Sequence, residues 1–268
     1  DLHDARVVVV VRIVHLHHGL EPLPPDRLGL EPQRPVRQRP ETPVVVLVDR
    51  PGVDQMPMAH PPPRVAIVGA EGLVGQELLK ILEERRFPAS SVRLFDSERN
   101  QGTEYFFSHE RLDIEEATAD SFRNVDVAFF CDGVDSCRRL MPAAVQAGAL
   151  VVDDSGVTIS DQSVPLVVPE VNAESISRHK GVLGNPSCSS IQLVVALFPL
   201  HSVNPIKRIV VSTYQPVSSS GTAAALKELT AQAKRVLEGR RVCPHMYSHQ
   251  IAFNVLPEID VFLDNGYT

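Results

Sequence analysis

The chain has 268 residues, of which 43% are hydrophobic and 22% charged, so it can bury a sizeable core and hold more than one folded unit. Its formal net charge of −7 excludes the broad basic surface that a nucleic-acid partner needs, and a small anionic ligand would require a local basic or amide-lined pocket. Its four cysteines form no CxxC pair and no apolar run reaches the roughly 18 residues of a membrane span, so we expect no disulfide scaffold, no metal site, no membrane segment and a cytoplasmic location.

Residues 1–63 differ in composition from the rest of the chain. They hold 12 of the 22 prolines and seven arginines, but no lysine and no aromatic residue. Such a composition is typical of a segment that does not pack, so we expect residues 1–63 to be a disordered or spurious extension. Met56 and Met58 are the only methionines before the ordered pattern begins, which makes one of them the expected native start.

From Arg64 onward, short apolar runs alternate with longer amphipathic ones, a pattern typical of βαβ units and a mostly parallel sheet. Strands are predicted at residues 65–68, 92–95, 125–130 and 150–152, and a helix at 138–147. Another helix follows the first strand, with an apolar face made of Leu73, Leu78, Leu79 and Leu82. The fold class predicted is α/β, with a Rossmann-like doubly wound parallel sheet in a nucleotide-binding domain over residues 64–185.

A second, α+β domain is expected over residues 186–268. Apolar positions predict a helix over 188–200 and a second helix over 222–237 with Leu226, Leu229, Ala233 and Leu237 facing inward. Between them, residues 206–214 are predicted to form a strand with alternating faces. Because nothing in the last residues marks a finished domain, we expect this domain to be incomplete.

A glycine-rich segment lies between the first predicted strand and its helix. It comprises Gly69, Ala70, Glu71, Gly72, Leu73 and Val74, followed by Gly75. Glycines at such a turn let backbone amides approach a pyrophosphate, and the helix N-terminus adds partial positive charge. These residues are therefore candidate cofactor-binding residues, although the same glycines could simply make a tight turn.

The end of the second predicted strand bears on which dinucleotide would bind. Asp96 favours NAD, because an acidic residue there binds the ribose hydroxyls. Ser97 and Arg99 favour NADP, because together they could hold a 2′-phosphate. We favour NADP.

Cys188 stands at the predicted start of a helix, between Ser187 and Ser189. The unpaired amides at a helix N-terminus stabilise a thiolate, and a thiolate can attack an activated acyl group. Taken alone, a cysteine before an apolar helix is more often a small buried hydrophobic residue.

Several separated segments resemble the aspartate-semialdehyde dehydrogenase family in order and spacing. Asn185-Pro186-Ser187-Cys188-Ser189-Ser190 is similar to its active-site motif NPNCST. The other segments span residues 164–172, 212–218, 251–257 and 264–268, so the resemblance runs from about Arg64 to the last residue.

The resemblance implies an NADP-dependent enzyme of lysine, threonine and methionine biosynthesis, assembled as a homodimer or homotetramer through a catalytic and dimerisation domain. It implies that Cys188 is the nucleophile, that Gln215 orients the substrate and that Ser218 and Ser219 lie near the cofactor. The thiolate would attack L-4-aspartyl phosphate, release phosphate and form a thioester, which hydride from NADPH reduces on the way to L-aspartate 4-semialdehyde.

Two departures from the family pattern motivate an alternative, a non-catalytic homologue acting in binding or assembly. Ile159 occupies the position of a phosphate-binding arginine, and Asp132 lies in a turn where the family has small residues. The family's substrate-carboxylate arginine and catalytic histidine are expected beyond Thr268, and His245 and His249 are expected to be surface or structural residues. A third interpretation is an N-acetyl-γ-glutamyl-phosphate reductase, an enzyme that uses the same thiol chemistry. Its cysteine typically lies in a Gly-Cys-Tyr-Pro-like segment, which Ser187-Cys188-Ser189 does not match.

Overall fold

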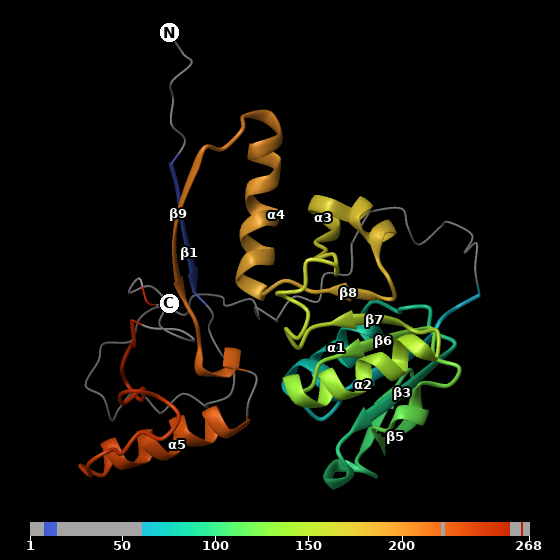
Figure 1. The fold of residues 1–268 in the computed structure, drawn as a ribbon. Helices are drawn as coiled ribbons and strands as arrows, with labels where there is room; N and C mark the ends of the chain where they lie inside the picture. Colours follow the sequence, from blue (N-terminus) through green and yellow to red (C-terminus); the bar gives the residue numbers. More distant parts are fainter. Residues whose placement is uncertain (1–7, 15–60, 221–222, 258–263, 265–268) are drawn as a thin grey trace. The chain divides into compact units, whose positions relative to one another are not determined.

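The computed structural model describes residues 8–14, 61–220, 223–257 and 264, which are coloured in Figure 1. These residues belong to two compact units. Residues 8–13 and 61–213 are in the first, and Val14 and the described residues from Tyr214 onward are in the second. The predicted domain division after residue 185 stays a prediction. Within residues 1–63, the structure describes residues 61–63 and a strand, β1 (Val8–Val14), which pairs with β9 (Arg208–Tyr214). Met56 and Met58 lie outside the described residues.

The first unit is built on a seven-stranded sheet in the order β4-β5-β3-β2-β6-β7-β8. The four predicted strands are present as β2 (Arg64–Val68), β3 (Ser91–Asp96), β6 (Val127–Phe130) and β7 (Leu150–Asp153). All neighbours in the sheet pair in parallel except β4 and β5, so the predicted α/β class with a mostly parallel sheet is confirmed.

Three strands of this sheet were not predicted from the sequence. They are β4 (Glu104–Phe107), β5 (Glu110–Glu116) and β8 (Val182–Gly184). β4 and β5 form an antiparallel hairpin at the edge, and most residues of β5 are charged and exposed. No apolar run marks these strands, because β4 has no fully buried residue, β5 buries only Ile114, and β8 is three residues long.

Helices cover both faces of the sheet (Figure 1). Alternate residues of β2 enter two separate cores, Val65 and Ile67 with α1 (Leu73–Glu84), and Ala66 and Val68 with α2 (Val134–Gln146). The α2 helix begins four residues before its predicted start at Arg138. The predicted apolar face of α1 was wrong at Leu73, which is 49% exposed, because it is the first residue of the helix and helical side chains tilt toward the N-terminus, where no earlier turn lies.

After β7 the chain forms α3 (Pro169–Asn172) and a 3-10 helix, η5 (Ala173–Arg178), before β8. Two shorter 3-10 helices, η3 (Glu98–Asn100) and η4 (Ala119–Phe122), follow β3 and β5. The predicted helix at Cys188 is confirmed as α4 (Cys188–Val203). The alternating faces predicted for β9 were wrong, since all seven residues of the strand are exposed.

The second unit contains η6 (Val217–Ser220) and α5 (Ala223–Leu237), the last of which confirms a predicted helix. Leu226 and Leu229 are half-buried as expected, but Leu237 is 69% exposed, because the helix ends at this residue. Gln232 is buried instead, and its side-chain oxygen accepts hydrogen bonds from the amides of Ile251 and Ala252 at 2.9 and 3.3 Å.

Within the described part of the chain, none of the helices combines the length and apolar character needed to traverse a bilayer. Over those same residues, no three histidine, cysteine, aspartate or glutamate side chains gather closely enough to hold a metal ion.

Candidate functional site

The glycine-rich segment forms a tight strand-to-helix turn between β2 and α1. Gly69 has a φ of +84°, and a Cβ atom there would lie 2.7 Å from the backbone nitrogen of Asp132. A Cβ atom on Gly75 would lie 2.8 Å from Cα of Ala70. Glycine is required at both positions, because the first needs left-handed backbone and both approach neighbouring backbone too closely for a side chain.

The turn leads directly into the N-terminus of α1. Gly72 occupies the N-cap position, where no side chain caps the helix, and Leu73 is the first helical residue. The first amides of a helix lack intrahelical partners and carry partial positive charge, so this end can bind an anion such as a phosphate. The six predicted cofactor-binding residues of the turn, Gly69 to Val74, thus form one continuous turn and helix start directly after β2.

Asp96, at the end of β3, holds the glycine turn in place. Its carboxylate accepts hydrogen bonds from the amide of Glu71 at 3.0 Å, the amide of Ser97 at 2.7 Å and the side chain of Asn100 at 2.8 Å. The side chain is 7% exposed. Because the protein's own N–H groups already occupy both carboxylate oxygens, Asp96 presents little acceptor capacity to a ribose.

Ser97 and Arg99, the other two predicted residues at this position, are both exposed. Arg99 lies in η3 and forms no ion pair with a described residue. Its guanidinium is therefore available to an anionic ligand beside the glycine turn.

Four loops of the first unit lie at one edge of the sheet. Four adjacent strands run parallel to one another: β2, β6, β7 and β8. Their carboxyl ends therefore lie along one edge of the sheet, and so do the segments that follow them (Figure 1). The glycine turn follows β2, and the segment leading to Cys188 follows β8. With a strand spacing of about 4.8 Å, three steps across the sheet place the two strand ends roughly 14 Å apart. Ligands of open α/β sheets bind beyond this edge.

Cys188 is the first residue of α4 and is half-buried. Ser187 is the N-cap, and its Oγ accepts a hydrogen bond from the amide of Ser190 at 3.4 Å. The Ser187 and Ser190 hydroxyl oxygens lie 2.9 Å apart. The structure therefore places the thiol at the amide end of a helix and leaves it partly open to solvent, as expected from the sequence.

Asn185 anchors the segment that precedes Cys188. Its amide donates to the backbone oxygen of Asp153 at 2.8 Å, and its side chain donates to the carboxylate of Asp154 at 2.5 Å. Burial raises the pKa of Asp154 above its ordinary value, although the Asn185 hydrogen bond opposes this shift. The sequence did not indicate a role for Asp154, because its partner, Asn185, lies 31 positions away in the sequence.

The turn after β7 is organised by Asp153, which is 1% exposed. Its carboxylate accepts hydrogen bonds from the amide and hydroxyl of Ser155 at 2.9 and 2.5 Å, and from those of Thr158 at 2.9 and 2.6 Å. Ile159 follows this turn with its side chain 48% exposed. An apolar side chain thus stands at the position that the family pattern assigns to a phosphate-binding arginine.

The other cysteines have different surroundings. Burial raises the pKa of the Cys131 thiol well above its ordinary range and that of Cys137 to about 11, so both stay protonated at neutral pH. The Cys137 thiol also donates to the backbone oxygen of Asp132 at 3.4 Å. Cys243 is exposed and does not lie at a helix N-terminus. Cys188 alone among the four lies at a helix start.

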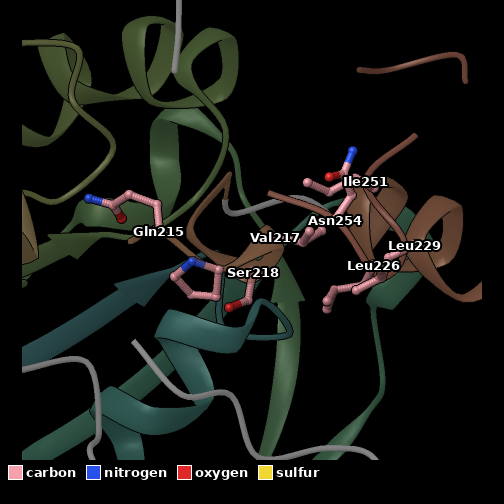
Figure 2. A pocket seen from close by; sticks show the side chains of 8 residues that line it. Gln215, Val217, Ser218, Leu226, Leu229, Ile251 and Asn254 are labelled. Carbon is pink, nitrogen blue, oxygen red and sulfur yellow. The ribbon is translucent and has the colours of Figure 1, made fainter. Parts of the chain in front are cut away.

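In the second unit, Gln215 and Ser218 line one pocket of about 280 Å³ together with Leu226, Leu229, Ile251 and Asn254. In Figure 2, the apolar side chains of α5 and Ile251 form one wall, and the Gln215 amide points away from Leu226 and Leu229. Ser219 follows in η6, but its side chain lies outside the described parts. The structure thus brings together two predicted site residues, and it adds Asn254, which lies in a segment that carried the family resemblance.

His245 and His249 are exposed, in keeping with the surface role expected for them. The backbone amide of His245, not its ring, contacts Glu228 at 2.8 Å, and the His249 ring lies 3.0 Å from the Ser248 hydroxyl.

Two family models match the chain. Residues 64–179 match the NAD binding domain of semialdehyde dehydrogenases, and residues 197–268 match their dimerisation domain. Aspartate-semialdehyde dehydrogenase from Bacillus subtilis is 42% identical over 211 residues, which are 76% of this chain. The chain belongs to the aspartate-semialdehyde dehydrogenase family.

Further members of the family support this assignment. The Aquifex aeolicus aspartate-semialdehyde dehydrogenase is 44% identical over 209 residues. The crystal structure of aspartate semialdehyde dehydrogenase II from Vibrio cholerae, complexed with ASA, superposes with a TM-score of 0.72 at 39% identity and covers 77% of this chain. The chain spans 61% of the length of the Bacillus and Aquifex proteins and 62% of the Vibrio chain.

Proposed function

We propose that the protein is an NADP-dependent aspartate-semialdehyde dehydrogenase that reduces L-4-aspartyl phosphate to L-aspartate 4-semialdehyde with release of phosphate. One observation carries the proposal most directly. Cys188 lies at the N-terminus of α4, at the same sheet edge as the glycine turn after β2. A two-step reduction of an acyl group requires a thiol to form the thioester and a nearby turn to hold the dinucleotide that reduces it.

The residues divide the chemistry between them. The Cys188 thiolate attacks the acyl carbon, the bond to the phosphate oxygen breaks, and a thioester forms on the sulfur. Partial positive charge at the start of α4 favours the anionic nucleophile. When bound at the glycine turn, NADPH would supply a hydride to the thioester carbon and leave as NADP; collapse of the thiohemiacetal would release the aldehyde and regenerate the Cys188 thiolate. The family resemblance assigns substrate orientation to Gln215 and cofactor contacts to Ser218 and Ser219.

Three features at the end of β3 support NADP over NAD. The Asp96 carboxylate is buried and already accepts three hydrogen bonds from the protein. Ser97 and Arg99 are exposed beside it. A guanidinium and a hydroxyl complement a 2′-phosphate, whereas a ribose diol needs a free carboxylate.

We further propose a cytoplasmic homodimer or homotetramer acting in lysine, threonine and methionine biosynthesis, with no nucleic-acid or membrane partner. The match to a dimerisation domain over residues 197–268 supports self-association. So do exposed apolar side chains on α4 and β9, among them Leu200, Val203 and Ile209. A helix that is apolar on all sides is normally buried, and a second copy of the chain would cover these side chains.

Ile159 favours a second candidate function, a non-catalytic homologue that binds or assembles. The exposed apolar side chain offers no charge to a phosphate. Half-buried Asp132 packs its backbone against Gly69 and brings a carboxylate close to the anion-binding turn.

A phosphate-dependent assay of the full-length protein with L-aspartate 4-semialdehyde and NADP tests both functions. We expect turnover that is lost in Cys188→Ala and retained in Cys243→Ala, whose exposed thiol lies elsewhere. Undiminished turnover in Cys188→Ala would reject Cys188 as the nucleophile, and dinucleotide binding without turnover in the unaltered protein would favour the non-catalytic homologue. Replacing Arg99 by Ala should weaken binding of NADP more than that of NAD.

A further inference from the structure

Glu71 places a carboxylate inside the glycine turn, between the two glycines that approach the phosphate site. All three of its polar groups have partners from different elements. Its amide donates to Asp96 at 3.0 Å, its carbonyl accepts from the Gln76 side chain at 2.8 Å, and its carboxylate accepts from the Tyr105 hydroxyl at 2.7 Å. The residue is therefore attached to β3, α1 and β4 at once.

Tyr105 is the single donor to the Glu71 carboxylate among the described residues. It lies on β4, the antiparallel edge strand, and its half-buried ring packs against the core that α1 covers. The ring is fixed by packing, so the hydroxyl is held in one place. Burial, followed by the contact with Glu71, raises the pKa of Tyr105 to about 12, which keeps the hydroxyl protonated and able to donate.

A carboxylate in a phosphate-binding turn is electrostatically unfavourable unless something restrains it. Like charges within several ångströms repel, and the repulsion grows as the ligand excludes water. A hydrogen bond from Tyr105 draws the Glu71 carboxylate toward β4. In the sheet, β5 and β3 lie between β4 and β2. Without that bond, the side chain would be free to rotate toward the amides that receive phosphate.

We propose that Tyr105 is a positioning residue for dinucleotide binding, which holds Glu71 so that the glycine turn is preformed and its carboxylate stays away from the cofactor phosphates. The proposal rests on the proposed function, because it takes the ligand of the turn to be a dinucleotide. The Tyr105 hydroxyl contacts the turn at the Glu71 carboxylate. It acts through Glu71.

Binding of NADPH and NADH, followed by their fluorescence, tests the proposal with the complete chain. Tyr105→Phe keeps the ring and removes only the hydroxyl, so we expect a cooperatively folded protein and about tenfold weaker binding of both dinucleotides. Adding Glu71→Gln removes the charge, and the double variant should bind within about threefold of the unaltered protein. A purely structural role for the Tyr105 hydroxyl predicts no such rescue.

Two results would overturn the proposal: Tyr105→Phe binding as tightly as the unaltered protein, or a double variant no better than Tyr105→Phe. If the unaltered protein binds neither dinucleotide, the proposed function fails, and hydrogen–deuterium exchange of the ligand-free protein decides the positioning role separately. Faster exchange at the amides of residues 69–76 in Tyr105→Phe would then support it, and equal exchange would refute it.

Discussion

The side-chain amide of Asn185 donates to the carboxylate of Asp154 at 2.5 Å, which ties the segment before Cys188 to the end of β7. Asp154 follows directly on the last residue of β7, and Asn185 follows directly on the last residue of β8. This contact links two neighbouring strands beyond their carboxyl ends. The starting position of α4, and with it that of Cys188, therefore depends on a carboxylate outside the cysteine's own segment.

Replacing Asp154 by Asn should change how stability depends on pH. The pKa of Asp154 is raised above 3.8 in the folded protein, chiefly by burial. Its contribution to stability is thus fully present below pH 3.8 and is lost as pH rises through the folded pKa. We expect Asp154→Asn to gain stability relative to the unaltered protein between about pH 4 and about pH 7, measured by urea unfolding. A constant difference across that range would contradict the expectation.

Asp126 should show the opposite pH dependence. Hydrogen bonds from the Arg64 side chain and amide lower the pKa of Asp126 from 3.8 to about 2. Its contribution is therefore present above pH 3.8 and is lost as pH falls through about 2. Asp126→Asn should be less stable than the unaltered protein at about pH 5 and equal to it near pH 2, by thermal unfolding at each pH.

Asp120→Asn serves as the control for Asp126. The Asp120 carboxylate pairs with Arg123 at 2.7 Å but is 81% exposed. An ion pair in open solvent contributes little, so this variant should leave stability unchanged. If both variants behave alike, the hydrogen bonds from Arg64 have no special role.

Gly69→Ala should separate the cost of close packing from that of backbone conformation. Gly69 and Gly102 have nearly equal φ values, +84° and +82°, but only at Gly69 would a Cβ meet neighbouring atoms, those of Asp132. We expect Gly102→Ala to cost about 1–2 kcal/mol for the left-handed conformation alone. Gly69→Ala should cost roughly 1–3 kcal/mol more, from overpacking, in urea unfolding. Equal losses would show that the turn yields to the added carbon without strain.

Phe122 should be the costliest aromatic side chain to remove from the first unit. It is 0% exposed, and its ring centroid lies 5.7 Å from that of Phe130 and 6.0 Å from that of Phe95. Phe122→Ala should lower the free energy of unfolding by about 3–5 kcal/mol. Phe106, 65% exposed on β4, provides the control, with an expected change within about 0.5 kcal/mol. A small loss for Phe122→Ala would mean that the core collapses into the space.

Much of the fold could be read along the chain because burial leaves a local pattern. Val65 to Val68 formed an apolar run because parallel strands are covered on both faces, and both cores contain alternate residues of that run. The hairpin of β4 and β5 left no such pattern, since β5 buries only Ile114. Leu73 and Leu237 were assigned inward because periodicity does not report where a helix leaves the surface that it covers.

The candidate site also contains residues that the sequence indicated and residues that only the structure revealed. Gly69 and Cys188 were identified because each needs a local context, a turn after a strand or the start of a helix, that a few adjacent residues specify. Tyr105 and Asp154 were missed, because their hydrogen-bond partners lie 34 and 31 positions away in the sequence. Nothing near a lone tyrosine or aspartate indicates which distant residue it will contact.

By itself, the sequence determined the α/β class, the glycine turn before α1 and the position of Cys188 at the start of α4, since hydrophobic periodicity and helix capping act over a few residues. Only the tertiary structure decided that Asp96 accepts a hydrogen bond from the Glu71 amide of the turn, that Tyr105 holds Glu71 and that Asp154 holds Asn185. These contacts depend on which strands become neighbours in the sheet, and strand order is set by the packing of the whole domain.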